Sequence, residues 1–165
     1  MSDDAAALEY SVSEPRVSIM RGFRHFYVSG RASMPRIEEA AGGLIDRLYA
    51  AYGRARHGVQ LPAILILSYG MPDETGEFDL TAGLNVTPVT EAVGEAQVEE
   101  VSDSRCASVL LRGRLRDLKE AHEALNAFVQ DKGLQYGPGF REWYLYWEGE
   151  DSANNVTLIT YDLAG

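Results

Sequence analysis

The sequence predicts an α+β fold, a tandem pseudo-twofold repeat of two β-α-β-β modules with an antiparallel sheet, two helices on one face and a ligand cleft between the halves. The first observation is an internal repeat, because Gly30-Arg31 before one helical segment recurs as Gly113-Arg114 before another, half a chain further on. The second is that a helix-periodic segment and two β-prone segments follow each copy. The third is the length of 165 residues, which suffices for one domain with a well-buried core.

The first half, about residues 9–88, is predicted to contain a strand, a helix and two further strands. Its helix begins at Pro35, which a first turn tolerates, and apolar residues recur along it at three- or four-residue steps. Gly42 and Gly43 each weaken this helix by about 1 kcal/mol if exposed, while their small size also suits close packing on a sheet. The turn-rich segment 70–76 separates the last two strands. The predicted ranges are 16–30 for the first strand, 35–56 for the helix, and 62–69 and 77–87 for the last two strands.

The second half, about residues 97–163, repeats this order. Asp117 suits an N-cap with Glu120 three residues on, as in a capping box. The helical stripe that follows stops at Gly133. The segment 89–104 is polar and acidic, and we interpret it as the linker between the halves of one domain that covers the whole chain. The predicted strands of this half are 106–112, 140–147 and 156–163.

The strand at 140–147 is unusually rich in aromatic residues. Successive side chains of a strand point to opposite faces of the sheet, so its residues divide into two sets. We predict that one set, a row of rings with a carboxylate in it, faces a ligand, and that the other lies beneath a helix. The first set is Phe140, Glu142, Tyr144, Tyr146 and Glu148, and the second is Arg141, Trp143, Leu145 and Trp147.

The predicted ligand site is the sheet face opposite the helices. One helix per module covers only one face of its strands, so two modules side by side leave the other face open. An open concave face rich in apolar side chains is a candidate ligand site. Aligning the repeats puts Ile64, Ile66 and Ser68 opposite Glu142, Tyr144 and Tyr146, and strand parity lets His25 and Tyr27 reach the same face.

Glu142 suggests the charge of the ligand. An isolated buried carboxylate costs several kcal/mol unless it is paired, hydrogen-bonded or neutralised. A lipophilic cation offsets this cost through its charge and through cation–π contacts of about 0.5 to 2 kcal/mol each. Two structural alternatives stay open, in which Glu142 pairs with an arginine such as Arg112 or Arg114, or faces water on an edge strand.

Composition limits the partners. The chain is 45% hydrophobic and 24% charged, as in ordinary soluble domains. Its formal net charge of −10 repels phosphate backbones and anionic lipids, so we expect no direct binding to nucleic acid and no membrane association. The single cysteine, Cys106, excludes an internal disulfide and a Cys-based metal cage. No metal-binding or nucleotide-binding motif is present, so we predict no metal and no cofactor.

The N-terminal stretch MSDDAAALEY is acidic and lacks the cationic start and apolar core of a signal peptide. The longest apolar run, 63–67, is far shorter than the roughly 20 residues of a membrane-spanning helix. We therefore expect a cytoplasmic protein. The sequence carries no pattern that specifies its oligomeric state.

The segment 137–144, Gly-Pro-Gly-Phe-Arg-Glu-Trp-Tyr, resembles the Gly-Pro-x-Phe-Glu-x-Tyr-like stretch of GyrI-like domains. These domains also serve as effector-binding domains of AraC-type and MerR-type transcription regulators. Further matches are Gly30-Arg31-Ala32-Ser33-Met34, Tyr69-Gly70 and Arg112-Gly113, so the resemblance spans about residues 9–163. The chain departs from the pattern by placing Arg141 between Phe140 and Glu142, and by having Glu148-Gly149-Glu150-Asp151 instead of an Asp-Pro turn.

The resemblance implies a pair of SHS2-type modules with a ligand cleft between them, in which Glu142 meets lipophilic, often cationic aromatic molecules. It thus favours multidrug-type binding or sequestration of hydrophobic or cationic small molecules. The domain leaves no segment for a helix-turn-helix, so we expect a stand-alone member. Trp147 joins the site if the twist at the strand end brings it to the rim. The expected ligand-binding residues are Glu142, Tyr144, Tyr146, Phe140, Trp147, Tyr27, His25, Ile64, Ile66 and Ser68.

Two alternative functions accompany this one. Some stand-alone members of the resembled family hydrolyse cyclopropane-bearing alkylating natural products, which here implies that Glu142 orients or deprotonates water while Tyr144 or Tyr146 donates to a developing oxyanion. A protein inhibitor, such as a gyrase inhibitor, would instead use the exterior of the domain. His122 is interpreted as a structural residue of the second helix.

Overall fold

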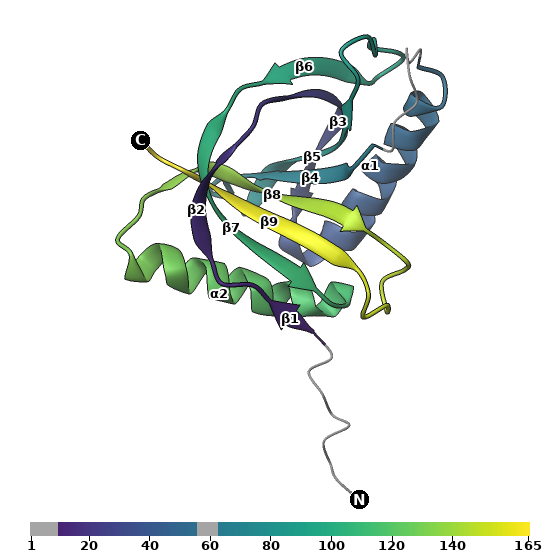
Figure 1. Ribbon diagram of the computed structural model, residues 1–165. Coiled ribbons are helices and arrows are strands. Elements are labelled where there is room, and N and C mark those ends of the chain that lie inside the picture. Colours follow the sequence, from purple (N-terminus) through teal and green to yellow (C-terminus); the bar gives the residue numbers. More distant parts are fainter. Residues whose placement is uncertain (1–9, 56–62) are drawn as a thin grey trace, which may run out of the picture.

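The computed structural model describes residues 10–55 and 63–165, and within them one antiparallel sheet and two helices (Figure 1). Hydrogen-bonded neighbours follow the order β1-β7-β9-β8-β4-β5-β3-β6, and β2 also pairs with β7. The helices are α1 (Ile37–Tyr52) and α2 (Leu118–Asp131). The strands are β1 (Ser11–Val12), β2 (Arg16–Met20), β3 (Phe23–Ser33), β4 (Leu65–Gly70), β5 (Glu77–Val86), β6 (Gln97–Val101), β7 (Ser104–Arg112), β8 (Tyr136–Tyr146) and β9 (Val156–Leu163).

The predicted repeat of two β-α-β-β modules is confirmed. The first module is β3-α1-β4-β5 and the second is β7-α2-β8-β9. Their strands lie in the mirrored orders β3-β5-β4 and β8-β9-β7, so a pseudo-twofold axis passes between β4 and β8. These two strands pair antiparallel from Leu65 opposite Tyr144 to Gly70 opposite Gly139. One continuous sheet therefore joins the two modules through the β4–β8 pair, while β1 and β2, which precede the first module, pair with β7 of the second.

Three parts of the strand prediction differ from the structure. The single strand expected at 16–30 is two strands, because β2 pairs with β7 whereas β3 pairs with β5. The segment expected to be a linker contains β6, which pairs with the outer side of β3 from Phe23 opposite Val101 to Tyr27 opposite Gln97. Such a polar edge strand lacks the hydrophobic alternation that marks a strand in a sequence. Strand β8 begins at Tyr136, ahead of the glycine-rich stretch that resembles a turn. A Cβ added at Gly137 would lie 2.9 Å from that of Asp162, so this glycine permits close strand approach.

The predicted cap at the N-terminus of α2 is wrong, whereas its predicted C-terminal end is confirmed. Asp117 forms no capping box with Glu120. Its carboxylate instead accepts the backbone N–H of Arg114 at 2.8 Å and closes a short 3-10 turn ahead of the helix. The predicted C-terminal end is confirmed, because Gly133 has a φ of 65° and the Leu134 N–H donates to the carbonyl of Val129 at 3.0 Å.

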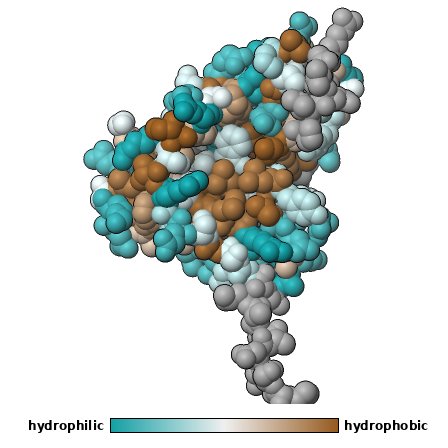
Figure 2. All heavy atoms as spheres, viewed as in Figure 1, coloured by the Kyte–Doolittle hydropathy of each residue, from teal (hydrophilic) through white to brown (hydrophobic). Residues whose placement is uncertain are grey.

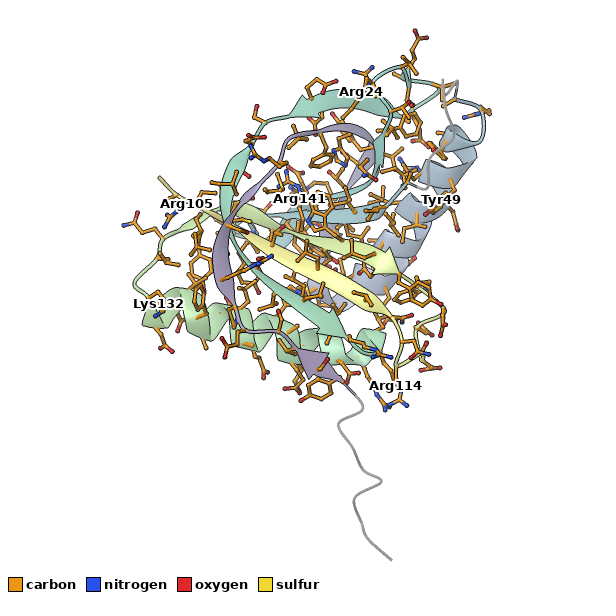
Figure 3. All side chains as sticks on the ribbon, in the orientation of Figure 1. Arg24, Tyr49, Arg105, Arg114, Lys132 and Arg141 are labelled. Atoms are coloured by element: carbon orange, nitrogen blue, oxygen red, sulfur yellow. The ribbon has the colours of Figure 1, made fainter. Side chains whose placement is uncertain are left out.

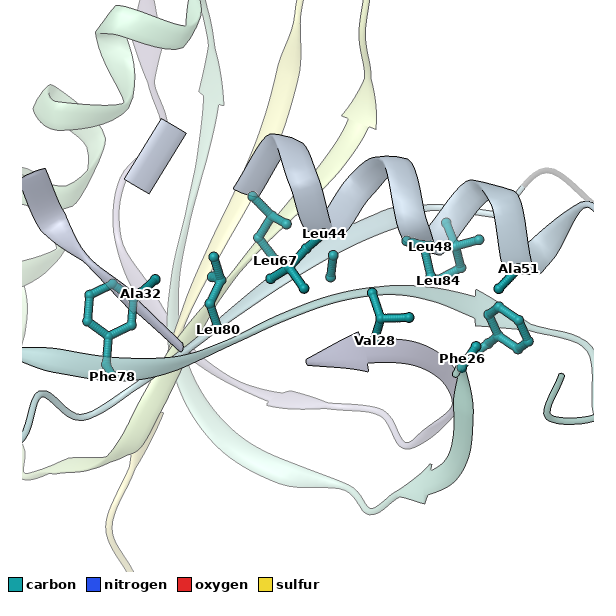
Figure 4. Close-up of a cluster of buried hydrophobic side chains, with 12 residues drawn as sticks. Phe26, Val28, Ala32, Leu44, Leu48, Ala51, Leu67, Phe78, Leu80 and Leu84 are labelled. Atoms are coloured by element: carbon teal, nitrogen blue, oxygen red, sulfur yellow. The ribbon is translucent and has the colours of Figure 1, made fainter. Parts of the chain in front are cut away.

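Both helices cover the same face of the sheet, but over its outer strands. Helix α1 packs on side chains of β3 and β5 such as Val28 and Leu84, in the cluster drawn in Figure 4. Helix α2 packs on β7, where Val109 and Leu111 are buried. Figure 1 shows the helices well separated, with β8 and β9 running between them. The central strands β4 and β8 are therefore the part of this face that the helices leave uncovered. No helix among the described residues has the length and apolar character needed to cross a bilayer.

The predicted placement of the two strand faces relative to the helices is wrong, because over residues 140–144 the set with the rings and the carboxylate faces the helix side and the other set faces away from it. Trp143 was expected beneath a helix but lies on the opposite face, where its ring meets Phe23 edge-on at 5.0 Å between centroids and its Nε1–H donates to Thr160. Arg141 shares that face and contacts Asp162 at 3.4 Å. In Figure 3 Arg141 lies near the middle of the sheet, whereas Arg105 and Lys132 lie at the periphery.

The helix-free face is not uniformly polar. Hydrophobic residues gather near the middle of the view in Figure 2. Large apolar side chains that are exposed among the described residues include Ile19, Leu110 and Leu145. Isolated apolar side chains of this kind are common on soluble proteins and carry no assignment by themselves.

A buried histidine depends on a glycine of the neighbouring strand. His25 is 2% exposed, stacks on Tyr27 at 4.9 Å and contacts Glu99 through Nδ1 at 3.0 Å. A Cβ added at Gly83 would lie 2.0 Å from its Nε2. In contrast, a Cβ at Gly43 on α1 would meet nothing within 4 Å, so the alternative that this helical glycine serves close packing is wrong.

Two glycine-to-alanine substitutions are expected to act in opposite directions. Gly83→Ala forces the buried His25 ring aside and should lower the free energy of unfolding by about 1–3 kcal/mol. Gly43→Ala removes a flexible residue from an exposed helix interior and should raise it by about 1 kcal/mol. Chemical denaturation of both variants checks this expectation, and equal stabilities would contradict the packing described for His25.

His25 should also make stability depend on pH. Burial lowers the pKa of His25 below its ordinary value of 6.5, although Glu99 opposes the shift. The unfolded chain then binds a proton that the native state resists, so stability should fall as pH drops below about 6.5, by at most about 1.4 kcal/mol per pH unit for one group. The difference in slope between the wild type and His25→Gln, from denaturation at several pH values, measures this contribution; identical slopes would contradict it.

Candidate ligand-binding cleft

The two central strands form the floor of a cleft. Three paired positions face the helix side, Leu65 opposite Tyr144, Leu67 opposite Glu142 and Tyr69 opposite Phe140. The middle pair continues a buried row across the sheet that is otherwise apolar. The row runs Val28, Ala82, Leu67, Glu142, Ile159 and Val109. A carboxylate therefore takes a position at the centre of the sheet that its neighbours in the row fill with aliphatic side chains.

The two helices form the walls. Helix α1 contributes small and aliphatic side chains, Ile37, Ala41 and Ile45, and α2 contributes Leu118, His122 and Asn126. The cavity has a volume of about 1130 Å³, which is large enough for a drug-sized molecule. Its charged lining residues besides Glu142 are Glu38, Lys119, Glu123 and Glu150, so acidic groups outnumber basic ones.

Glu142 is 5% exposed and is held by three side chains. Its Oε1 accepts hydrogen bonds from the hydroxyls of Tyr69 at 2.6 Å and Tyr144 at 3.0 Å. Its Oε2 lies 2.8 Å from Nε2 of His122. Tyr69 belongs to the first module and the other two donors to the second, so the site is built across the junction of the halves.

His122 continues into a chain of polar contacts that reaches the edge of α2. Its Nδ1 lies 2.6 Å from the hydroxyl of Tyr161, which also accepts the Asn126 side-chain N–H at 3.2 Å. Asn126 in turn accepts the hydroxyl proton of Tyr136 at 2.7 Å. With the Tyr161 hydroxyl donating to Nδ1, the Nε2–H of His122 donates to Glu142.

Aromatic rings surround the carboxylate. Tyr69 and Phe140 are stacked with centroids 4.4 Å apart and an interplanar angle of 11°. Phe140 also meets the ring of His122 edge-on at 5.2 Å. Trp147 meets Tyr144 edge-on at 5.6 Å and lines the cleft from the end of β8. The three side chains that donate to Glu142 are thus aromatic themselves, and the rings of Phe140 and Trp147 pack against them.

The tyrosines of the cleft remain protonated donors. Burial raises the pKa of Tyr69 and of Tyr144 far above the ordinary tyrosine range, and the negative charge of Glu142 raises both further. Burial likewise raises the pKa of Tyr161. These hydroxyls therefore act as neutral hydrogen-bond donors at physiological pH, and they stabilise the charged form of the carboxylate.

Known structures share this fold. The C-terminal domain of EcmrR matches with a TM-score of 0.74 at 17% identity, over 94% of this chain and 98% of that domain. The structure of SAV2435 bound to tetraphenylphosphonium matches with a TM-score of 0.61 at 13% identity, over 93% and 95% of the two chains. A hydrolase from Listeria innocua matches with a TM-score of 0.59 at 13% identity, over 92% of each chain. The chain has the GyrI-like fold.

At sequence identities of 13–17% this similarity establishes the fold alone. The function has to be inferred from the residues of the cleft. The chain spans 58% of the EcmrR chain present in a DNA complex, which it matches with a TM-score of 0.69 at 16% identity. No protein-family model matches the sequence, and no curated protein does so.

Four of the expected site residues meet in the cleft of this GyrI-like fold. Phe140, Glu142, Tyr144 and Trp147 all line it. The sequence alternatives in which Glu142 pairs with an arginine or faces water do not apply, since its partners are two tyrosines and a histidine and it is buried. Arg112 instead contacts Asn154, and Arg114 contacts the carbonyl of Asp151.

The other expected residues lie elsewhere. Ile64 and Ile66 pack around Trp143 on the opposite face, and Ser68 pairs with Arg141. The assumed alignment of the repeats put the even-numbered residues of β4 in the cleft, whereas Leu65, Leu67 and Tyr69 face it. His25 and Tyr27 also occupy the opposite face, since Phe26 and Val28 are the β3 residues beneath α1. A β-bulge between Tyr144 and Tyr146 turns Tyr146 outward, where its hydroxyl donates to Glu148.

Three functional candidates were missed from the sequence. His122 follows Leu118 by four residues and precedes Leu125 by three, so helical spacing places it at the edge of the apolar stripe. Tyr69 lies in one of the short motifs that resemble the GyrI-like pattern, yet its side chain was given no role. Tyr161 lies on β9, and its contact with His122 depends on how α2 sits on the sheet.

Proposed function

We propose that the cleft binds lipophilic aromatic cations and so serves to sequester or sense such molecules. The observation that carries the proposal is the buried carboxylate of Glu142 on the floor of a large apolar cleft. Among the described residues no lysine or arginine pairs with it, and the charge partner it has is His122.

The physical chemistry of the lining fits such a ligand. Three donors stabilise the anion, so Glu142 can stay charged in spite of its burial. A cation placed beside it gains electrostatic energy in a poorly hydrated site, and the rings of Phe140 and Trp147 offer contacts of about 0.5 to 2 kcal/mol each. The aliphatic side chains of α1 and β4 then cover the apolar body of the ligand.

The comparison with SAV2435 supports this proposal. That protein was solved with tetraphenylphosphonium, a cation whose charge is enclosed by four phenyl rings, and it shares the fold over nearly the whole of this chain. The same chemistry, a single positive charge in an aromatic shell, suits an acidic cleft lined by rings.

A hydrolase is the second candidate, and the pairing of Glu142 with His122 is the observation that favours it. In this scheme Glu142 takes a proton from a water molecule that attacks an electrophilic ring carbon, the ring bond breaks, and the leaving atom takes up a proton. Glu142 then gives this proton to the leaving atom and is restored as the base, while the Nε2–H of His122 keeps the carboxylate oriented. The Listeria innocua hydrolase of the same fold supports testing this scheme.

Glu142→Gln should weaken binding of tetraphenylphosphonium at least about tenfold, since a loss of roughly 1.4 kcal/mol corresponds to that factor and the substitution removes the whole charge. Titration calorimetry measures the change. Tyr146→Phe is the matched control, because its hydroxyl donates to Glu148 outside the cleft, and it should bind as the wild type does. Unchanged affinity in a folded Glu142→Gln protein would refute the proposed site.

The hydrolase candidate predicts turnover of a cyclopropane-bearing alkylator. Incubation followed by mass spectrometry should show a product one water molecule heavier than the substrate, and Glu142→Gln should abolish its formation by removing the base. Absence of product with the wild-type protein would reject this candidate and leave the binding function standing.

A further inference from the structure

The hydrogen-bonding capacity of Glu142 is largely used by the protein. A carboxylate offers about four lone-pair positions, two on each oxygen. Tyr69 and Tyr144 occupy both positions on Oε1, and His122 occupies one on Oε2. A ligand can therefore gain one charge-assisted hydrogen bond at most without displacing a side chain of the protein.

The rest of the lining offers few strong acceptors deep in the cleft. The floor is completed by Leu65, Leu67 and Phe140, which carry no polar side-chain atoms. The hydroxyl oxygens of Tyr69 and Tyr144 are neutral, and hydrogen bonds to neutral oxygens are roughly half as strong as those to a carboxylate. Asn126 already accepts the hydroxyl proton of Tyr136. The other carboxylates of the lining, such as Glu123, lie on exposed residues.

These limits separate two kinds of cation. A primary ammonium ion carries three N–H donors, which water satisfies in solution and which lose partners on entering the cleft. A quaternary ammonium or phosphonium ion carries none, so it keeps its attraction to Glu142 and to the rings without leaving a donor unpaired.

Building on the proposed function, we infer that His122 makes the cleft selective for cations without N–H groups, quaternary ammonium and phosphonium ions, over protonated primary amines with the same aromatic body. His122 acts by keeping an N–H on Oε2 of Glu142. Its side chain is 21% exposed and lines the cleft, so removal of its ring opens that position to a ligand. It is a positioning residue that sets specificity through the carboxylate.

The test uses a matched pair of ligands, biphenyl-4-ylmethylammonium and its N,N,N-trimethyl derivative, both cationic at pH 7.5. The wild type should bind the trimethyl ion at least about tenfold more tightly than the primary ammonium. The reason is that each N–H donor left unpaired in the cleft raises the dissociation constant by about that factor. In His122→Leu the ratio of the two dissociation constants should fall at least about threefold, because the primary ammonium gains a second position on Oε2.

His122→Gln is the matched variant, since its side-chain amide can still donate to Glu142, and its ratio should stay within about twofold of the wild type. Each variant is measured with both ligands. A general loss of packing weakens the binding of both to a similar extent, so it cancels from the ratio of the two dissociation constants. If His122→Leu does not fold, Tyr144→Phe serves instead, as it frees one position on Oε1 and should also lower the ratio.

The outcomes separate this inference from the proposed function. A ratio that is unchanged in His122→Leu, or in Tyr144→Phe where that variant replaces it, or a wild type that prefers the primary amine, overturns the role of His122 while cation binding stands. Failure of both cations and of tetraphenylphosphonium to bind overturns the proposed function itself and the inference with it.

Discussion

The burial of one carboxylate at the centre of the sheet is the constraint on which the cleft depends. Glu142 occupies a row that is otherwise Val, Ala, Leu and Ile, where a charge is tolerated only with donors in place. Those donors come from β4, β8 and α2, so the buried carboxylate has its full set of donors only when both modules are docked. The same contacts that solve the problem of burial also define the position and orientation of the anion.

The cleft itself follows from the mirrored order of the modules. Each helix packs on the outer strands of its own half, while the pseudo-twofold axis brings the two inner strands together. The surface between the helices therefore belongs to neither half alone. A helix of ordinary diameter, about 10–12 Å, covers about two strands spaced about 4.8 Å apart, so two helices leave part of a six-stranded pair of modules uncovered at its centre.

The sequence was sufficient to predict the repeat, the helices and the aromatic strand, because these depend on local periodicity. It could not settle which face of β8 lies on the helix side. The alternation of a strand divides its side chains between two faces but does not say which face the helices cover. The register of β4 against β8 and the bulge that turns Tyr146 outward are tertiary features. His122 reaches Glu142 from another element, and helical spacing indicates only that it borders the apolar stripe.

The two halves share a topology but not a chemistry. Strand β4 presents Leu65, Leu67 and Tyr69 to the cleft, whereas β8 presents Tyr144, Glu142 and Phe140. The first module thus supplies an apolar surface and one hydroxyl group, whereas the second supplies the carboxylate of Glu142 and two of its three hydrogen-bond donors. Because the polar groups of the cleft lie mainly on the second module, substitutions on β8 and α2 can change which ligand binds. The packing of the first module is then left unchanged.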